Sequence, residues 1–338
     1  MRTRIAIAVC VGAALAGAAT TFAVEQTGLQ KQNEILFQQL QQVFHLTDLQ
    51  MSNIRGIFAR SGYMGQGNPA ITVHPLTPAQ CQAKVGQAAA YENPEFEKIC
   101  GAKYMAPLYD PKTQKPSDAK ACIDQFEFPD IPCTYPVVWT KAREAAEVCE
   151  AEGKRICDAH EWEGACEGSL QPPDYDFDLA KGVDASTAVN RMRNKHNRED
   201  EPSKSWSYGP TYTRGICATG SEKSANCPGG GYGLCGSNTY PTGSFPACHS
   251  PLDVYDLNGN AAEHMNLPLS PDQMASRGSK TLGVTEMKGS WFIFDKYRAH
   301  EDWCRWRAPY WHGSRVMDPG SHANYHLGFR CCLTLDGH

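Results

Sequence analysis

Cysteine is the residue type that most constrains how this chain can fold, because its 338 residues include 15 cysteines. A reducing cytosol rarely retains so many thiols without a metal or a redox function. In exported proteins, by contrast, cysteines pair into disulfides that stabilise domains with long irregular loops. The compartment in which the chain folds is therefore the first question that the sequence must answer.

The first 23 residues have the pattern of a secretory signal peptide. Two arginines precede an apolar run over residues 5–19, and small residues then allow cleavage after Ala18 or Ala23. The run is short for a membrane-spanning helix, although an uncleaved segment that tethers the protein to a membrane is the alternative. Cleavage would remove Cys10 and leave an even number of cysteines. We therefore expect a secreted, periplasmic or cell-surface protein that contains as many as seven disulfides.

The charge balance restricts the partners of the chain. Its formal net charge is −5, whereas nucleic acids and anionic membranes require a basic face. We therefore expect no nucleic-acid partner.

Residues 24–62 are predicted to form two helices. Thr47 and Gln50 match a capping box that begins the second helix, which should stop near Gly62. Residues 25–58 could mediate docking or oligomerisation, or they could form a spacer packed on the main domain. The spacer is favoured because no heptad pattern is sustained. The first helix shows the spacing of one apolar face in Leu29, Leu36, Leu40 and Val43.

Beyond this segment the sequence alternates between irregular and helical stretches. Residues 63–99 form a linker region rich in glycine and proline. A helix is then predicted from Thr140 to Glu152, and a capping box at Asp158 begins another that continues through Cys166. Residues 170–250 are irregular, which predicts a loop-rich domain that needs crosslinks.

Three blocks of sequence carry a resemblance to a known family. The first block includes Cys122-Ile-Asp-Gln-Phe-Glu127, Gly153-Lys-Arg155 and Glu161-Trp-Glu163, the second includes Asp256-Leu-Asn-Gly259-Asn-Ala261-Ala-Glu263, and the third opens with Lys288-Gly-Ser-Trp291 and closes with Leu327-Gly-Phe-Arg-Cys331. Together they resemble the formylglycine-generating enzyme, or sulfatase-modifying factor, family. The resemblance covers roughly residues 100–336 and implies that 100–338 form an α+β domain, an irregular, loop-rich variant of the C-type lectin fold with several disulfides. The α-helical N-terminal segment lies outside it.

The resemblance implies a structural calcium at the second block. Its ligands would be the Asp256 side chain, the carbonyls of Gly259 and Ala261, and the Glu263 carboxylate. Oxygen ligands on a short bent segment are what calcium prefers. The alternative is an ordinary turn with a solvated glutamate.

The resemblance also implies the disulfides Cys149–Cys331 and Cys166–Cys304. A third, parallel bridge is expected between the additional cysteines Cys157 and Cys332. Local bridges are expected between Cys81 and Cys100 and between Cys122 and Cys133. Two further bridges join Cys217, Cys227, Cys235 and Cys248 in a pairing that the sequence leaves open, and zinc is disfavoured because their spacing lacks a C-x-x-C pair.

The sequence departs from the family at its catalytic centre. Formylglycine formation in the family requires two cysteine thiolates that bind copper(I). Counting from Ser290, the matching positions are Ile293 and Arg298. Formylglycine generation is therefore not expected. The alternative activity is that of a metal-dependent oxidase or modifying enzyme with another centre, for which the candidate ligands are His300, Glu301, His312, His322 and His326.

An aromatic segment over residues 291–311 provides the candidate binding surface. Aromatic faces interleaved with arginine suit a peptide or a glycan, and we expect half of the rings to be core and half to line a groove. The chain is thus predicted to be a non-catalytic binding or scaffold module for a protein, peptide or glycan. The candidate ligand-binding residues are Trp291, Phe292, Trp303, Trp306, Arg298, Arg305 and Arg307.

Overall fold

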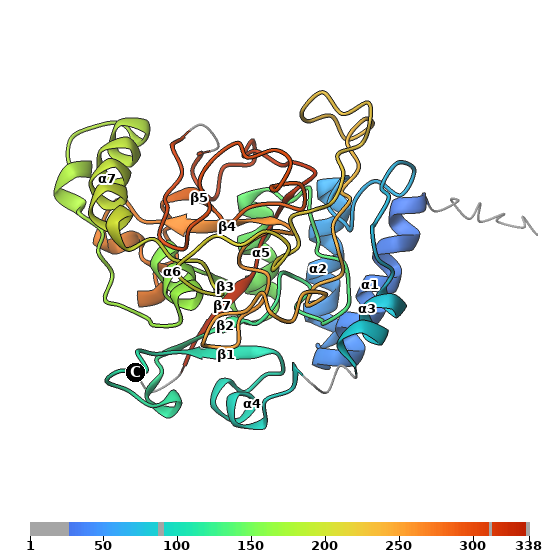
Figure 1. Cartoon of the computed structure of the whole chain (residues 1–338), viewed down its shortest axis with the longest axis horizontal. Helices are drawn as coiled ribbons and strands as arrows, with labels where there is room; N and C mark the ends of the chain where they lie inside the picture. The colour runs from blue at the N-terminus through green and yellow to red at the C-terminus, as the bar shows by residue number, and fades with distance from the viewer. Residues whose placement is uncertain (1–26, 87–90, 311–312, 336–338) are drawn as a thin grey trace, which may run out of the picture.

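The computed structural model describes residues 27–86, 91–310 and 313–335 (Figure 1). The predicted signal peptide, with Cys10, lies outside the described residues. The helices are α1 (Gly28–Phe44), α2 (Asp48–Ser61), α3 (Pro78–Val85), α4 (Pro94–Cys100), α5 (Ala142–Ala151), α6 (Ala159–Glu167) and α7 (Ala185–Asp200). The strands are β1 (Met105–Leu108), β2 (Ala121–Asp124), β3 (Arg155–Ile156), β4 (Ala262–Leu267), β5 (Val284–Lys288), β6 (Leu327–Gly328) and β7 (Cys331–Thr334).

Two small sheets organise the strands. One has the order β1-β2-β7-β3 and is antiparallel throughout, and the other has the order β5-β4-β6 with a parallel β4–β6 pair. The C-terminal strand β7 lies between β2 and β3, so the end of the chain completes a sheet that begins near residue 105. Residues 204–261 contain only isolated bridges. This mixture of helices, short strands and long loops confirms the expected irregular α+β fold.

The N-terminal helices belong to the core of the molecule. Thr47 and Gln50 form the capping box of α2, and Gly62 ends the helix in a left-handed conformation, as predicted. Helix α2 packs against α5, and Figure 1 shows α1 and α2 side by side along one edge of the molecule. Leu36 and Ile54 are fully buried in the same apolar cluster as residues of the main domain. These helices are therefore packed on the main domain, as the spacer interpretation expected.

Other local predictions are also confirmed. Helix α5 spans Ala142–Ala151 within the predicted 140–152, and α6 begins at the capping box of Asp158 with Glu161. The described residues include no helix that is both long and apolar enough to cross a bilayer.

Every cysteine that the structure describes is in a disulfide. The bonds Cys149–Cys331, Cys166–Cys304 and Cys157–Cys332 are those that were expected. The four cysteines whose pairing was open form Cys217–Cys248 and Cys227–Cys235.

The two expected local bridges are wrong. Cys81 bonds to Cys133 and Cys100 bonds to Cys122. The physical reason is the packing of α4, which ends at Cys100 against the β1–β2 hairpin, so its terminal cysteine lies beside strand β2 and not beside α3. Cys81 on α3 instead lies near the carbonyl of Thr242, which also accepts the Cys133 N–H.

Removal of both parallel disulfides should cost much more stability than removal of one. While Cys157–Cys332 is intact, the double variant Cys149→Ala, Cys331→Ala opens a loop of only about ten residues, for which loop entropy predicts a loss of about 2.5 kcal/mol. Removal of Cys157–Cys332 as well leaves Cys166–Cys304 as the nearest crosslink, which opens a loop of about 40 residues and should add about 4 kcal/mol. Denaturant unfolding at equal pH measures both losses. A quadruple variant that is as stable as the double variant would contradict the assigned pairing.

Candidate functional site

The positions that match the copper-binding cysteines carry other chemistry. Ile293 is 2% exposed and packs in an apolar cluster with Phe292 and Tyr325. Arg298 is exposed, and its guanidinium carbon lies 4.3 Å from the ring centre of Tyr212. All cysteines in the described part of the chain are oxidised. The described residues therefore include no thiolate pair that could hold copper(I).

The aromatic segment is divided between core and surface. Trp291, Phe292 and Trp303 are buried, and Trp306 is half-buried. Trp311 lies outside the described residues. The seven candidate ligand-binding residues do not come together as one surface, because Arg298 points to solvent while Arg305 and Arg307 turn inward.

Arg307 is the centre of a buried ion network. Its guanidinium donates two hydrogen bonds to Glu163, at 2.9 and 3.0 Å, and one to Asp174 at 2.7 Å. Lys288 Nζ lies 3.1 Å from the same glutamate. Arg305 donates to Asp174 at 2.6 Å, and to Asp200, the last residue of α7, at 2.7 Å. The two arginines therefore attach the α7 segment to the body of the protein.

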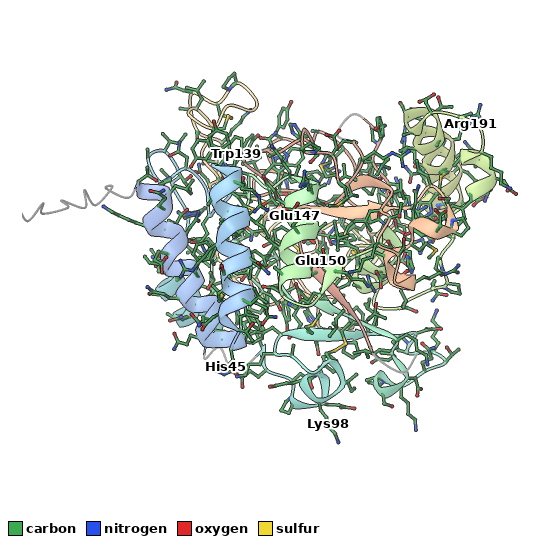
Figure 2. The ribbon with its side chains drawn as sticks, turned by 180° about the vertical axis from the view of Figure 1, so that it is seen from behind. His45, Lys98, Trp139, Glu147, Glu150 and Arg191 are labelled. Carbon is green, nitrogen blue, oxygen red and sulfur yellow. A yellow bond between two sulfur atoms is a disulfide. The ribbon has the colours of Figure 1, made fainter. Side chains whose placement is uncertain are left out.

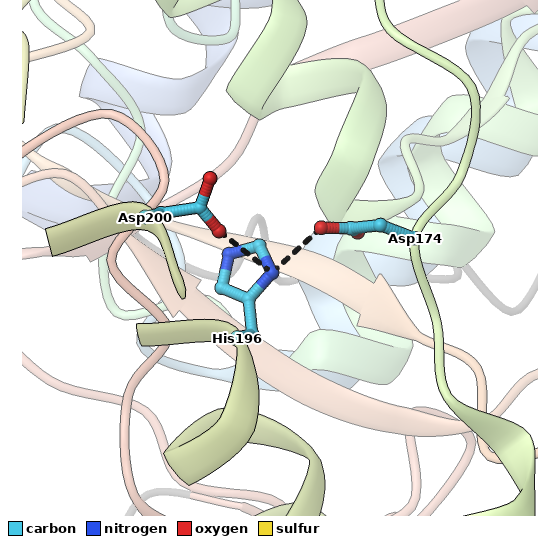
Figure 3. Close-up of side chains that lie close together, drawn as sticks. All are labelled: Asp174, His196 and Asp200. Atoms are coloured by element: carbon cyan, nitrogen blue, oxygen red, sulfur yellow. Dashed lines mark hydrogen bonds and ion pairs between the residues drawn. The ribbon is translucent and has the colours of Figure 1, made fainter. Parts of the chain in front are cut away.

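His196 adds a candidate metal cluster to this network (Figure 3). Its Nδ1 lies 2.8 Å from Asp174 and 3.4 Å from Asp200, and one ligand atom of each residue falls within 4.8 Å of the others. Its Nε2 lies 2.7 Å from the Arg305 carbonyl, so both ring nitrogens already face oxygen atoms. Both carboxylates are neutralised by arginine. The three residues therefore fit an ion-pair network and not a metal centre.

The charges in the network shift the titration of its carboxyl groups. Burial works to raise the pKa of Glu163, but the charges of Arg307 and Lys288 outweigh it and lower the pKa to about 2. Burial also works to raise the pKa of Asp174, but the hydrogen bond from His196 and the charge of Arg307 outweigh it and hold the pKa well below its usual range.

The sequence analysis did not find this network, because its members come from five separate segments of the chain.

A second buried cluster surrounds the expected calcium ligands. Arg330 pairs with both oxygens of Glu263 at 2.7 Å, and Trp162 Nε1 donates to the same carboxylate at 3.0 Å. Glu127 accepts the Ala261 N–H at 2.6 Å. Asp256 accepts the Gly243 N–H through Oδ2, whereas its buried Oδ1 has no hydrogen-bond partner among the residues that the structure describes.

The electrostatics of this second cluster fit a divalent cation. Three carboxylates, those of Glu127, Asp256 and Glu263, share one guanidinium, so the cluster carries two excess negative charges when all three are ionised. Burial raises the pKa of Asp256 to about 7 and that of Glu127 well above its usual value. Because Arg330 already holds Glu263, the oxygen that remains available to a cation is Asp256 Oδ1.

The turn between these carboxylates requires glycine. Gly259 has φ +90°, and a Cβ atom there would lie 2.9 Å from the Ala218 carbonyl oxygen. A side chain would therefore displace the backbone that carries the expected ligands.

The candidate histidines of the alternative activity pack among aromatic rings. His300 stacks on Trp306 at 5.0 Å, and His326 stacks on Trp291 at 4.6 Å. Burial lowers the pKa of His300. The segment that carries His322 and His326 is not helical, so their spacing does not place them on one helix face. Glu301 is exposed, and His312 lies outside the described residues.

The fold and these clusters define a disulfide-rich α+β protein with buried ion networks. No sequence model of a protein family and no curated protein matches the chain. PvdO from Pseudomonas aeruginosa is similar over 68% of this chain and 91% of its own, with 13% identity and a TM-score of 0.32. CarF is similar over 77% and 84%, with 14% identity and a TM-score of 0.27. Likeness at these TM-scores supports no conclusion about the site.

Glu163→Gln should destabilise the protein by about 3 kcal/mol, because it leaves buried cations without a full counter-charge. The pKa of Glu163 is lowered from 4.5 to about 2, so its stabilising contribution is complete above pH 4.5 and is lost as the pH falls toward 2. The variant should lack that part of the acid dependence. Denaturant unfolding between pH 2.5 and pH 7 measures both effects.

The matched control is Glu199→Gln on α7, where the glutamate is exposed and, within the described part of the chain, forms an ion pair with Lys195. It should change stability by less than about 0.5 kcal/mol. An acid dependence that is the same in the wild type and in Glu163→Gln would contradict the role of Glu163.

Proposed function

We propose that the chain is an exported, disulfide-stabilised domain of the sulfatase-modifying-factor type that binds a peptide or a glycan without catalysing a reaction. The observation that carries the proposal is the state of the cysteines: all 14 that the structure describes are in disulfides, and the two matching copper positions are Ile293 and Arg298. Thiolates are the ligands that copper(I) chemistry of this kind requires. A binding role, by contrast, requires no thiolate ligand and depends only on side chains at the protein surface.

The surface around Arg298 supports ligand binding. Its guanidinium lies over the rings of Tyr212 and Phe294 at 4.3 and 5.0 Å. Tyr297 beside it is 61% exposed, and Trp306 is half-buried. An arginine already ordered by two rings offers donors to a ligand with little loss of side-chain entropy.

The same proposal includes export and a structural calcium. Seven disulfides suit an oxidising compartment outside the cytosol, in keeping with a signal peptide at residues 1–23 or with a retained membrane tether. The calcium would bind Asp256 Oδ1 and the carbonyls of Gly259 and Ala261, and Glu263, whose oxygens already accept from Arg330 and Trp162, would contribute its negative charge to the site. Self-association through residues 25–58 is a further part of the proposal, since Ile35 and Leu49 there are 61% and 71% exposed.

Peptide and glycan arrays test the binding role. The wild type should retain a defined set of peptides or glycans, and Arg298→Ala should weaken that binding at least about tenfold, because it removes a cation held between rings. Arg277→Ala changes another exposed arginine, at the end of the 3-10 turn Ala275–Arg277, and should leave binding intact. Thermal unfolding of both variants checks that each remains folded.

A copper assay addresses the absence of catalysis. Copper(I) and a cysteine-containing peptide should produce no oxygen uptake above the rate without protein. Stoichiometric copper binding with oxygen uptake would overturn the proposal, and so would equal binding losses in the two arginine variants.

Calcium should raise the melting temperature of the wild type, and Asp256→Ala should abolish most of that increase. The substitution also leaves the Gly243 N–H unpaired, but this cost is the same with calcium and with chelator, so the calcium-dependent shift isolates the metal. Because the pKa of Asp256 is about 7, protonation competes with the metal, and the shift should be larger at pH 8 than at pH 5. Differential scanning fluorimetry measures it.

Asp253→Asn serves as the control, because this aspartate is half-exposed and pairs with His249 on the same loop. It should retain the full calcium-dependent shift. A wild type whose melting temperature is the same in calcium and in chelator would contradict the site.

A further inference from the structure

A pocket of about 430 Å³ lies where helix α6 ends, and no member of the two charged clusters described above lines it. Its walls come from Glu167, the last residue of α6, from the turn over residues 205–210 and from residues 247–251. The first and last of these walls are in close contact, because a Cβ atom at Gly168 would lie 2.5 Å from Pro251 Cδ. The volume is typical of a site for a small molecule.

Disulfides and a tight turn hold the walls of this pocket in place. Glu167 directly follows the disulfide cysteine Cys166, and His249 directly follows the disulfide cysteine Cys248. Residues 206–209 form a turn that is closed by two main-chain hydrogen bonds, of 2.8 and 3.0 Å. A ligand therefore meets side chains on an ordered backbone, which lowers the entropy cost of binding.

Two half-buried aromatic rings, those of Trp206 and Tyr208, line the pocket from this turn. Trp206 is fixed in position, because its Nε1 donates to Asp302 at 2.9 Å and its ring centre lies 5.8 Å from that of Tyr212. The Tyr208 hydroxyl accepts the Thr213 N–H at 3.3 Å. Because the face of an aromatic ring carries partial negative charge, such rings attract the C–H groups of a ligand.

Glu167 and His249 bring hydrogen-bond acceptors to the same pocket. Solvent reaches both, since their side chains are 22% and 42% exposed. Arg305 Nη1 lies 3.6 Å from the Glu167 carboxylate, which is too far for a hydrogen bond. His249 Nδ1 lies 3.0 Å from the Ser250 carbonyl, so the neutral ring carries its proton there and leaves Nε2 as an acceptor.

The charges around the pocket favour an uncharged ligand that donates hydrogen bonds. Among the described residues that line it there is no lysine or arginine, so an anion would meet the Glu167 carboxylate without a cation to bind. An ammonium group would instead be repelled by Arg305, which already lies beside Glu167. Hydroxyl groups are neutral donors and avoid both penalties.

A proline-rich peptide fits the rings of the pocket but not its acceptors. Proline has no N–H, so a run of prolines brings no donor to Glu167 or His249. A sugar ring combines a C–H face with several hydroxyl donors, and it therefore matches both the aromatic and the polar part of the lining.

We propose that this pocket binds an uncharged sugar, whose ring packs on Trp206 and Tyr208 and whose hydroxyl groups donate to Glu167 and His249. The site goes beyond the proposed function, because none of the residues that line it belongs to the surface around Arg298.

Ligand-observed NMR titration of the oxidised full chain tests the site with four probes. Three are the neutral trisaccharides maltotriose, cellotriose and triacetylchitotriose, and the fourth is the peptide acetyl-hexaproline-amide. At least one trisaccharide should bind with a Kd of about 1 mM or tighter, and the proline peptide should bind at least about tenfold more weakly than that sugar.

Paired variants connect the binding to the pocket. Tyr208→Ala should weaken binding of that trisaccharide at least about tenfold, whereas Tyr208→Phe retains the ring, loses only the hydroxyl that accepts the Thr213 N–H, and should bind within about twofold of the wild type. Glu167→Gln should weaken binding at least about fivefold, because a carboxylate is a stronger acceptor than an amide. The control is Glu150→Gln on α5 (Figure 2), where the glutamate is exposed and pairs with Lys280, and it should bind as the wild type does.

The proposal is overturned if no trisaccharide shows saturable binding up to about 10 mM, or if the proline peptide binds as tightly as the best sugar. It is also overturned if Tyr208→Ala and Glu167→Gln, with unchanged melting temperatures, bind the sugar like the wild type.

Arg298→Ala separates this site from the proposed function. The variant should bind the trisaccharide as the wild type does, so its loss of array binding bears only on the proposed function. A loss of trisaccharide binding as large as that of Tyr208→Ala would place the sugar on the surface around Arg298 and overturn the pocket.

Discussion

The ion pair between Arg330 and Glu263 is the contact on which the two sheets depend. Arg330 precedes β7 of one sheet, and Glu263 lies in β4 of the other. The guanidinium also donates to the carbonyls of Asp124, Gln125 and Tyr255, so it ties the end of β2 to the turn before β4. Both partners are fully buried. Loss of either would leave a buried charge, which is among the most costly defects a fold can carry.

The two residues after Arg330 extend this connection covalently. Cys331 bonds to Cys149 on α5, and Cys332 bonds to Cys157 after β3. Because adjacent strand residues point to opposite faces, the two disulfides attach β7 to structures on both sides of its sheet. Long loops such as residues 204–261 can then be accommodated, since the elements around them are fixed by crosslinks and a buried ion pair.

Local sequence signals predicted the local structure well, and the failures concern contacts between distant segments. The capping boxes of α2 and α6 involve residues three positions apart, so their patterns are visible in the sequence. The pairing of Cys81 with Cys133 depends instead on where α3 packs, which no local pattern specifies. Arg305 and Arg307 resembled surface residues because their carboxylate partners, including Glu163 and Asp174, are more than 100 positions away.

The buried carboxylates fall into two groups that differ in what compensates them. Around Glu163 the cations Arg307 and Lys288 suffice, and the pKa falls to about 2. Around Asp256 and around Glu152 the carboxylates outnumber the cations, and burial raises the pKa of both residues. A fold that tolerates such an excess is least strained electrostatically when a further cation binds. Compensated networks therefore serve architecture, whereas at the uncompensated ones a bound proton relieves the excess charge, and the proposed calcium would compete with that proton at Asp256.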